Sequence, residues 1–300
     1  MKKVQILMST YNGEKYLRTQ IDSILEQNYL NIQLLIRDDG SSDSTLKILE
    51  EYSASNEKVS YYTGDNIGVI NSNFDLIRRS DPSAHYYSFA DQDDYWMPNK
   101  LSQAIIALEK LDKNQPLLYC SKPTLADKDL KILDVNIRTI EIRPCFGNAL
   151  VENICTGCTA VINNTMFDLV KKHIPEYVIM HDWWLYLLAS YFGQVYYDKE
   201  SYILYRQHSD NVMGARTNYW NEFLTRLHNY KGNRGKIRKQ LAELQKVFNG
   251  EINNTESLKE LINSHQNLVS RLNLIRSHEV FRQRKMDDII FKILILIGQL

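Results

Sequence analysis

The chain has 300 residues, and its 36 Lys and Arg balance its 36 Asp and Glu, so that the formal net charge is zero. With 44% hydrophobic and 11% aromatic residues, this composition predicts a folded globular protein and excludes wholesale disorder, a collagen-like chain and a basic protein that binds nucleic acid. Four Cys are too few for a disulfide scaffold, the first residues do not read as a secretory leader, and no apolar run reaches the roughly 18 residues of a membrane span, so we expect a cytoplasmic protein.

The first part of the chain alternates between short apolar runs and helical spacing. Strands are predicted at residues 4–8, 32–36, 59–62 and 86–90, and amphipathic helices follow the first three. This alternation predicts an α/β fold with a mostly parallel sheet and helices on both faces. Because parallel strands end at the same edge of a sheet, we expect the polar loops after these strands to converge there.

The middle of the chain is less regular. It predicts strands at residues 117–120 and 159–162, with a loop region between them that extends to Asn148. A helix is predicted at 182–191. Two further strands follow it and are expected to pair with each other and close this region, at residues 195–197 and 202–205.

Apolar residues in the tail, residues 216–300, have the spacing of two amphipathic helices. The tail contains 15 basic and 8 acidic residues, a net charge of +7, which leaves −7 on residues 1–215. Basic residues at 282–285 precede the apolar stretch 289–297, and this combination suits an anionic membrane surface. A solvated helix face beside a homo-oligomer seam is an equal alternative. The apolar positions are Ile237, Leu241, Leu244 and Phe248 in the first helix and Leu261, Leu268, Leu272 and Ile275 in the second.

Three carboxylates stand together in the loop after the fourth predicted strand, at 91–94 (DQDD). They repel one another unless a cation lies among them. Hard divalent ions such as Mg²⁺ or Mn²⁺ prefer oxygen ligands of this kind and commonly share them with phosphates. The alternative interpretation is a solvated acidic turn that caps the following helix.

The loop after the first strand, at 9–13 (STYNG), offers hydroxyls, an aromatic face and a glycine. Such a loop suits a nucleobase that stacks on the ring, and a plain turn with a half-buried tyrosine is the alternative. The adjacent aspartates at 38–39 do not fit the nucleophile loop of aspartyl phosphatases, in which two aspartates stand one residue apart on the first strand.

Four polar segments, taken in order, resemble the motifs of the large inverting glycosyltransferase family 2, which is typified by bacterial polysaccharide synthases. They are 9–13 (STYNG), 38–43 (DDGSSD), 66–68 (NIG) and 91–96 (DQDDYW). Four motifs in the right order are much harder to meet by chance than any one of them.

This resemblance implies a catalytic domain over residues 1–215 with the Rossmann-like GT-A fold, which binds a nucleotide sugar. The nucleotide-sugar half is expected over about 1–115 and the acceptor half over about 116–215. Residues 216–300 then form a basic, helical C-terminal appendage.

The resemblance also assigns residues to the nucleotide by position. Ser9, Tyr11 and Asp39 match residues that hold the base and ribose, and Asp38 stands beside them. Asn66 begins a segment that matches a loop near the phosphates. These five residues are the expected nucleotide-binding set.

Asp91 and Asp93 match the metal-binding aspartates of the family, for which Mg²⁺ or Mn²⁺ is the implied cofactor. His208, in the segment 205–208 (YRQH) after the last predicted strand, is a further candidate metal ligand or diphosphate contact. Arg206 in the same segment is a candidate contact for the leaving phosphates.

Asp182 matches the position at which the family carries its general base, at the head of a helix. An acceptor hydroxyl becomes a competent nucleophile only as its proton leaves, and a carboxylate within hydrogen-bond reach can take that proton. The alternative is that Asp182 caps the helix. Trp183 and Trp184 are candidates for a platform on which the acceptor sugar stacks, and the core is the alternative place for at least one of them.

The sequence of residues 89–101, together with HDWW at 181–184 and YRQH at 205–208, looks most like that of rhamnosyltransferases that build bacterial surface polysaccharides. That resemblance implies dTDP-rhamnose as donor and a lipid-linked glycan acceptor, with the protein peripheral on the inner face of the plasma membrane. A UDP-hexose donor and a non-catalytic carbohydrate-binding scaffold are the alternatives. A nucleotidyltransferase is disfavoured, because it would carry a glycine-rich, lysine-bearing first loop.

Cys155 and Cys158 have the spacing of half a zinc site. Cys120 and Cys145 do not form a second close pair in the sequence. We therefore expect no zinc at this position.

Overall fold

The computed structural model describes residues 1–134, 140–208, 235–252, 256–264 and 267–298. They form two compact units. The first unit holds residues 1–134, 155–172 and 192–208, and the second holds 140–154, 173–191 and the described residues from 235 onward. The predicted boundary at residue 215 lies outside the described residues. The two units are also not separated at a single point in the chain, because residues 140–154 and 173–191 group with the tail.

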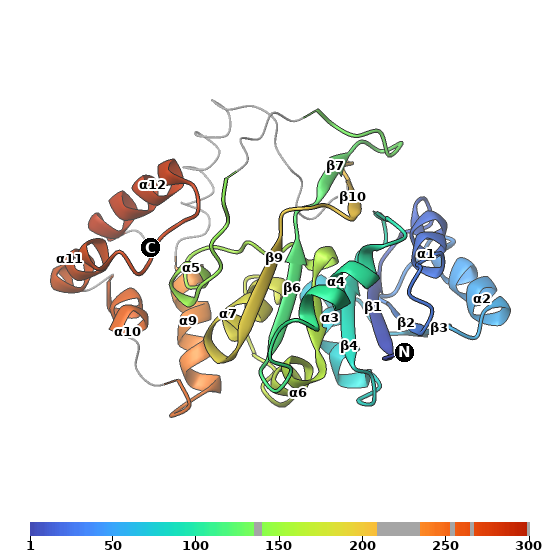
Figure 1. The fold of residues 1–300 in the computed structure, drawn as a ribbon, viewed down its shortest axis with the longest axis horizontal. Helices are drawn as coiled ribbons and strands as arrows, with labels where there is room; N and C mark the ends of the chain where they lie inside the picture. Colours follow the sequence, from blue (N-terminus) through green and yellow to red (C-terminus); the bar gives the residue numbers. More distant parts are fainter. Residues whose placement is uncertain (135–139, 209–234, 253–255, 265–266, 299–300) are drawn as a thin grey trace. The chain divides into compact units, whose positions relative to one another are not determined.

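A seven-stranded sheet forms the centre of the first unit, in the order β3-β2-β1-β4-β8-β6-β9 (Figure 1). The four strands β3, β2, β1 and β4 are parallel, as predicted, and β8 runs antiparallel to both of its neighbours. The strands are β1 (Val4–Thr10), β2 (Ile32–Asp38), β3 (Val59–Thr63), β4 (Tyr86–Ala90), β6 (Leu117–Ser121), β8 (Val161–Asn163) and β9 (Gln194–Asp198).

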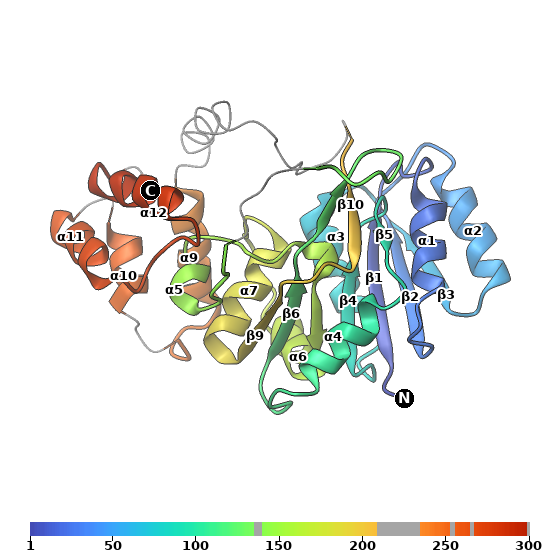
Figure 2. The same ribbon diagram turned by 45° about the horizontal axis from the view of Figure 1, so that its top comes forward.

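Helices cover both faces of this sheet, which is why its central strand is apolar on both sides. Along β1, Val4, Ile6 and Met8 are fully buried in one core cluster with residues of α1, α2 and α4. On the opposite face, Tyr87 of β4 stacks on Phe167 of α6 with ring centroids 3.7 Å apart. Figure 2 shows α1 and α4 in front of the strands and α3 behind them. The helices are α1 (Leu17–Leu25), α2 (Thr45–Ser55), α3 (Gly68–Arg79), α4 (Lys100–Leu108) and α6 (Asn164–Lys172).

A second, three-stranded sheet has the order β5-β10-β7, with β5 (Tyr95–Trp96), β7 (Thr124–Ala126) and β10 (Ile203–Arg206). The predicted pairing of the strands at 195–197 and 202–205 is wrong. β9 pairs in parallel with β6 in the large sheet, whereas β10 pairs with β5 and β7. The chain between them crosses from one sheet to the other, and this crossing brings the segment after β10 beside the acidic loop.

The second unit is helical. It contains α5 (Phe146–Ala149), α7 (His181–Phe192, of which the last residue belongs to the first unit), α9 (Lys236–Val247), α10 (Glu256–Asn263), α11 (Leu268–Ser277) and α12 (Lys285–Leu296). The first predicted tail helix is confirmed as α9. The second is two helices, because Asn267 starts α11 anew by accepting a hydrogen bond from the backbone N–H of Val269. Within the described residues, no helix has both the length and the apolar character to cross a membrane.

Candidate active site

The loops after β1, β2 and β4 lie together at one edge of the large sheet, so the predicted convergence is confirmed. Gln92 Oε1 accepts a hydrogen bond from the backbone N–H of Tyr11 (2.9 Å), and Gln92 Nε2 donates to the Tyr11 carbonyl (3.0 Å). Asn12 Oδ1 in turn accepts from the backbone N–H of Ser42 (2.8 Å). The three loops therefore form one connected surface.

The first loop presents its tyrosine outward. The Tyr11 side chain is 48% exposed, and the residue after it, Asn12, has a φ of 47° in the left-handed region. A Cβ on Gly13 would lie 2.3 Å from Gln92 Oε1, so any larger residue here would force the Gln92 side chain to shift. Ser9, half-buried, is the next-to-last residue of β1. An exposed ring in a rigid loop suits the stacking that was predicted for Tyr11.

Asp39 connects the end of β2 to the loop after β3. Its buried carboxylate accepts from the backbone N–H groups of Ile67 (3.2 Å) and Gly68 (2.9 Å), and it pairs with Arg37 (2.9 Å). Asn66, which is exposed, also accepts from Gly68 N–H (3.2 Å). Gly68 has a φ of +79°, which favours glycine at this turn. The predicted phosphate loop is thus held in place by Asp39.

Asp38 is not placed to contact a nucleotide, and its prediction as a nucleotide-binding residue is corrected. Its exposed fraction is 0%. One oxygen accepts from the backbone N–H groups of Gly40 (3.1 Å) and Ser41 (2.9 Å), and the other accepts from the hydroxyls of Ser41 (2.6 Å) and Thr10 (3.1 Å). Asp38 therefore fixes the shape of its own loop from inside.

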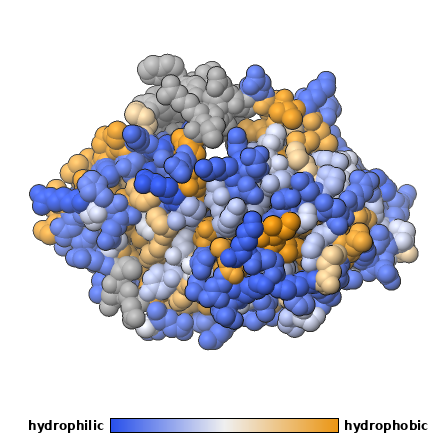
Figure 3. All heavy atoms as spheres, viewed as in Figure 1, coloured by the Kyte–Doolittle hydropathy of each residue, from blue (hydrophilic) through white to orange (hydrophobic). Residues whose placement is uncertain are grey.

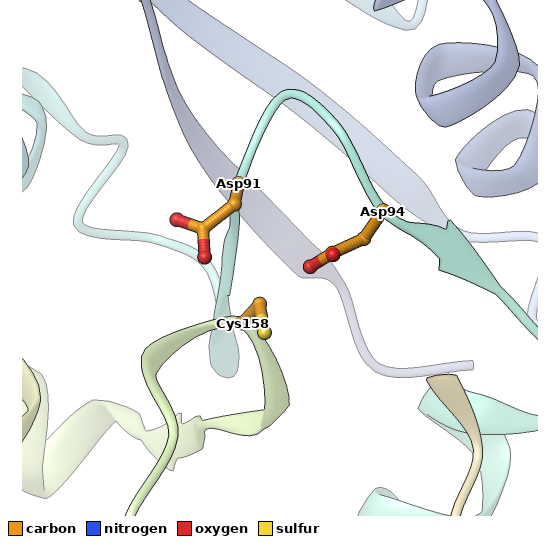
Figure 4. Close-up of side chains that lie close together, drawn as sticks. All are labelled: Asp91, Asp94 and Cys158. Carbon is orange, nitrogen blue, oxygen red and sulfur yellow. The ribbon is translucent and has the colours of Figure 1, made fainter. Parts of the chain in front are cut away.

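The acidic loop separates its three carboxylates into two groups. Asp93 Oδ2 lies 2.8 Å from His208 Nε2. Ligand atoms of Asp91, Asp94 and Cys158 lie within 4.8 Å of one another, and Figure 4 shows the three side chains close together. Cys158 comes from the short helical turn η1 (Gly157–Thr159) before β8.

Asp94 is the most buried member of this cluster. Burial raises its pKa well above the ordinary value, and the charges of Asp91 and Asp93 raise it further. Asp94 Oδ2 has no nitrogen or oxygen hydrogen-bond partner among the described residues. Two carboxyl groups that lie this close together, one of them buried, are a place where a divalent cation would offset their repulsion.

The donor set fits an ion held mainly by oxygen. Carboxylate oxygens are the ligands that Mg²⁺ and Mn²⁺ prefer. A thiol sulfur is a softer ligand than a carboxylate oxygen, so Cys158 suits a hard ion less well than the carboxylates do. Asp91 lies in this cluster, whereas Asp93, the other predicted ligand, contacts His208. Asp94 was predicted only as one carboxylate of the acidic loop, and Cys158 was not predicted to lie here. That these groups bind a metal stays a prediction. Only the CxxC spacing pointed at Cys158, and sequence spacing does not reveal that it folds against the acidic loop.

Arg206 lies inside the acidic loop, and this corrects its prediction as a phosphate contact. It is 4% exposed, and its backbone N–H donates to Asp94 Oδ1 (3.1 Å). Its side chain donates through Nε to the carbonyl of Asp93 (2.6 Å) and through Nη1 to the carbonyl of Lys128. The guanidinium also lies 4.3 Å from the ring centroid of Tyr16. Arg206 therefore holds the acidic loop.

In the second unit, Asp182 is the second residue of α7. The carboxylate is 7% exposed, and its Oδ1 accepts from Asn153 Nδ2 (3.0 Å) and from the backbone N–H of Trp183 (2.7 Å). Asp182 thus accepts a hydrogen bond from a backbone N–H in the first turn, as a capping residue does, although it lies inside the helix and not before it. Its assignment as general base stays a prediction.

The two tryptophans after Asp182 are buried. Trp184 is 0% exposed and lies 6.4 Å from Phe248, measured between ring centroids. Trp183 is 8% exposed and donates its indole N–H to the carbonyl of Ala149 (2.7 Å). A fully buried indole offers no face to a sugar, so the predicted acceptor platform is wrong for Trp184. Trp183 is held in the same core by its hydrogen bond.

Known proteins similar in sequence are glycosyltransferases. The family model described as glycosyl transferase family 2 matches residues 5–167. An uncharacterized glycosyltransferase of Rickettsia typhi is 28% identical over 73% of this chain and 69% of its own length. The dTDP-rhamnosyl transferase RfbG of Shigella flexneri is 31% identical over 71% of this chain and 75% of its own. The Escherichia coli enzyme WfgD, named as a β-1,3-glucosyltransferase that uses UDP-Glc, is 29% identical over 62% and 70%.

Solved structures share the fold. TarS of S. aureus in complex with UDP-GlcNAc superposes with a TM-score of 0.53 at 17% identity, over 92% of this chain and 81% of that one. The mannosyltransferase PcManGT of Pyrobaculum calidifontis in complex with GDP-Man and Mn²⁺ superposes with a TM-score of 0.52 at 13% identity, over 91% and 72%. With the family model covering more than half of the chain, the protein belongs to glycosyl transferase family 2 and has a GT-A-like fold.

Proposed function

We propose that this glycosyltransferase is a metal-dependent, inverting enzyme that transfers rhamnose from dTDP-rhamnose to a hydroxyl of a lipid-linked acceptor in bacterial cell-surface glycan synthesis. The observation that carries the proposal is the junction of the Tyr11 loop with the acidic loop through Gln92. It puts an exposed aromatic ring and a carboxylate cluster on neighbouring loops of one sheet edge, as binding of a nucleoside diphosphate sugar requires.

In this proposal the base of the nucleotide stacks on Tyr11, and Ser9 lies beside the ribose. The buried Asp39 positions the loop after β3 through its hydrogen bonds to that loop, and Asn66 faces the phosphates from there. The hydrogen bond from the Gly68 N–H to Asp39 keeps this loop in the position in which it orients the donor.

Asp91 and Asp94 would hold the divalent ion, with Asp93 nearby. When bound, the ion supplies positive charge to the diphosphate as its bond to the sugar breaks. His208 keeps the Asp93 carboxylate in one position through their 2.8 Å contact, and Arg206 keeps the loop backbone in place. We assign both residues to positioning.

Asp182 is the proposed general base. It takes the proton of the acceptor hydroxyl while the acceptor oxygen forms a bond to the anomeric carbon, from the side opposite the nucleotide. The bond from that carbon to the phosphate oxygen breaks, and the electron pair leaves with the nucleoside diphosphate. No covalent enzyme intermediate is needed, and the product has inverted anomeric configuration.

The donor assignment rests on the relative named for dTDP-rhamnose, and a second candidate rests on the relative named for UDP-Glc. The lipid-linked acceptor implies that the protein works at the inner face of the plasma membrane. A non-catalytic scaffold would have no use for a nucleotide-binding loop that is hydrogen-bonded to a loop carrying a carboxylate cluster.

Calorimetric titration with dTDP and with UDP, in the presence and absence of Mn²⁺, tests the donor. We expect dTDP to bind at least about tenfold more tightly than UDP, and only with metal. Tighter binding of UDP would favour the glucose alternative, and binding of neither nucleotide would overturn the proposal.

Nucleotide release from dTDP-rhamnose then tests the catalytic residues. We expect Asp91→Asn and Asp182→Asn to lose release by about 100-fold or more, a typical contribution of a catalytic group. Asp134→Asn, a change at an exposed aspartate, is the matched control and should retain wild-type activity. Retained release in Asp182→Asn would remove Asp182 from its proposed role.

A further inference from the structure

The last described helix has apolar side chains on two sides. Phe291 and Ile295 of α12 pack inside the second unit with exposed fractions of 0% and 1%. Five other apolar residues of the same segment are exposed by 45% to 62% and recur at intervals of three and four residues, which places them on one side of the helix. They are Met286, Ile289, Ile293, Leu296 and Ile297.

Helix α11 extends this surface. Leu268, Val269 and Leu272 are exposed by 58%, 63% and 37%. Arg271, on the same turn, donates a hydrogen bond to the carbonyl of Leu296 (3.2 Å), so the start of α11 lies next to the end of α12. Figure 3 shows apolar side chains gathered over these two helices. We call these eight residues the outer apolar face. Such a face costs solubility unless something covers it.

Basic side chains border the outer apolar face. Lys285 is exposed and stands one helical turn before Ile289, and Lys292 stands one turn before Leu296. Lys292 pairs with Asp288 (2.8 Å). Residues 267–298, which include both helices, contain six Lys and Arg and three Asp and Glu, a net charge of +3. Two copies that met through this face would bring their basic residues together, whereas an anionic surface would neutralise them.

We propose that the outer apolar face docks onto an anionic lipid bilayer. The Ile and Leu side chains enter the boundary between headgroups and acyl chains, and the exposed Lys285 contacts lipid phosphates. This inference deepens the proposed function and rests on it in one respect: a lipid-linked acceptor lies in such a bilayer. The docking itself needs neither donor nor metal.

Sedimentation of the full chain with vesicles tests the docking. The vesicles contain equal parts of phosphatidylglycerol and phosphatidylcholine, and phosphatidylcholine alone serves as the neutral comparison. We expect binding to the anionic vesicles and at least about tenfold weaker binding to neutral ones. Ile289→Asp with Ile293→Asp should lower binding to the anionic vesicles by about tenfold or more.

The matched control is Ile106→Asp on α4 of the other unit, because Ile106 is 50% exposed and Ile289 and Ile293 are each 51% exposed. It should bind vesicles as the wild type does. Lys285→Gln should weaken binding by about fivefold, the effect of one charge near an anionic surface. Circular dichroism and thermal unfolding check that each variant is folded.

Several outcomes would overturn the proposal: no binding of the wild type to anionic vesicles, equal binding to neutral vesicles, or unchanged binding after Ile289→Asp with Ile293→Asp. A dimer in light scattering that the same double variant dissociates, without vesicle binding, would assign the face to self-association. Because the vesicles contain no acceptor and the assay no donor, a failure here is distinct from a failure of nucleotide binding or release.

Discussion

The carboxamide of Gln92 makes both of its hydrogen bonds to the backbone of one residue, Tyr11, through N–H···Oε1 at 2.9 Å and Nε2–H···O at 3.0 Å. Gln92 stands between Asp91 and Asp93 in the acidic loop, whereas Tyr11 belongs to the loop that is proposed to bind the base. One side chain thus couples the nucleoside end of the site to its phosphate end.

Gln92→Ala should weaken nucleotide binding without unfolding the protein. Loss of two hydrogen bonds of about 1 kcal/mol each lets the Tyr11 loop move away from the acidic loop, and about tenfold weaker binding of dTDP with Mn²⁺ is expected. Isothermal titration calorimetry measures this, and Gln103→Ala on α4 is the control. Equal dTDP affinity of wild type and Gln92→Ala would show that the two hydrogen bonds of Gln92 do not contribute to nucleotide binding.

Gly13→Ala should produce the same defect. The added Cβ would lie 2.3 Å from Gln92 Oε1, so the flexible end of Gln92 must shift, and we expect this shift to weaken its hydrogen bonds to Tyr11. The double variant with Gln92→Ala should therefore be no worse than either single variant, a strongly non-additive cycle. Additive losses in dTDP affinity would mean that Gly13 acts independently of Gln92.

Metal binding should depend on carboxylates and not on the thiol. Electron paramagnetic resonance of bound Mn²⁺ should show at least about tenfold weaker binding in Asp91→Asn and Asp94→Asn, because each removes a charged oxygen from the cluster. Cys158→Ala should bind Mn²⁺ as the wild type does, as should the buried control Cys120→Ala. A selective loss in Cys158→Ala would instead make the thiol a ligand.

Lys100 should make the stability of the protein increase with pH. Its ammonium group is buried 3.5 Å from the ring centroid of Trp96, and burial lowers its pKa to about 7. The unfolded chain, with an ordinary lysine pKa of 10.5, therefore holds a proton that the folded chain has released between about pH 7 and 10.5. The free energy of unfolding rises with pH across that window, and the burial penalty is largest below pH 7.

Urea denaturation of the wild type and of Lys100→Met measures this effect. The difference in unfolding free energy, wild type minus variant, should increase from pH 7 to pH 9 by up to about 1.4 kcal/mol per pH unit. Subtraction of the variant removes the contributions of other groups. A difference that does not change with pH would place the folded-state pKa of Lys100 near its ordinary value.

The amino-acid sequence by itself determined the alternation of strands and helices and the sheet edge that carries the polar loops. Both follow from local rules: apolar runs and helical spacing identify β1 to β4 and their helices, and parallel strands must end together. The same local periodicity identified α9 from Leu241 and Leu244. The family motifs stood in these loops, so the class of chemistry could be predicted as well.

Only the tertiary structure decided which side chains of each motif reach the site. Asp38 and Asp39 are neighbours in the sequence, yet successive residues of an extended segment point in opposite directions, so one closes its own loop and the other reaches the loop after β3. Cys158 meets Asp94, and His208 meets Asp93, through contacts between residues far apart in the chain. Local periodicity carries no information about such contacts, because they depend on how the sheets and loops pack.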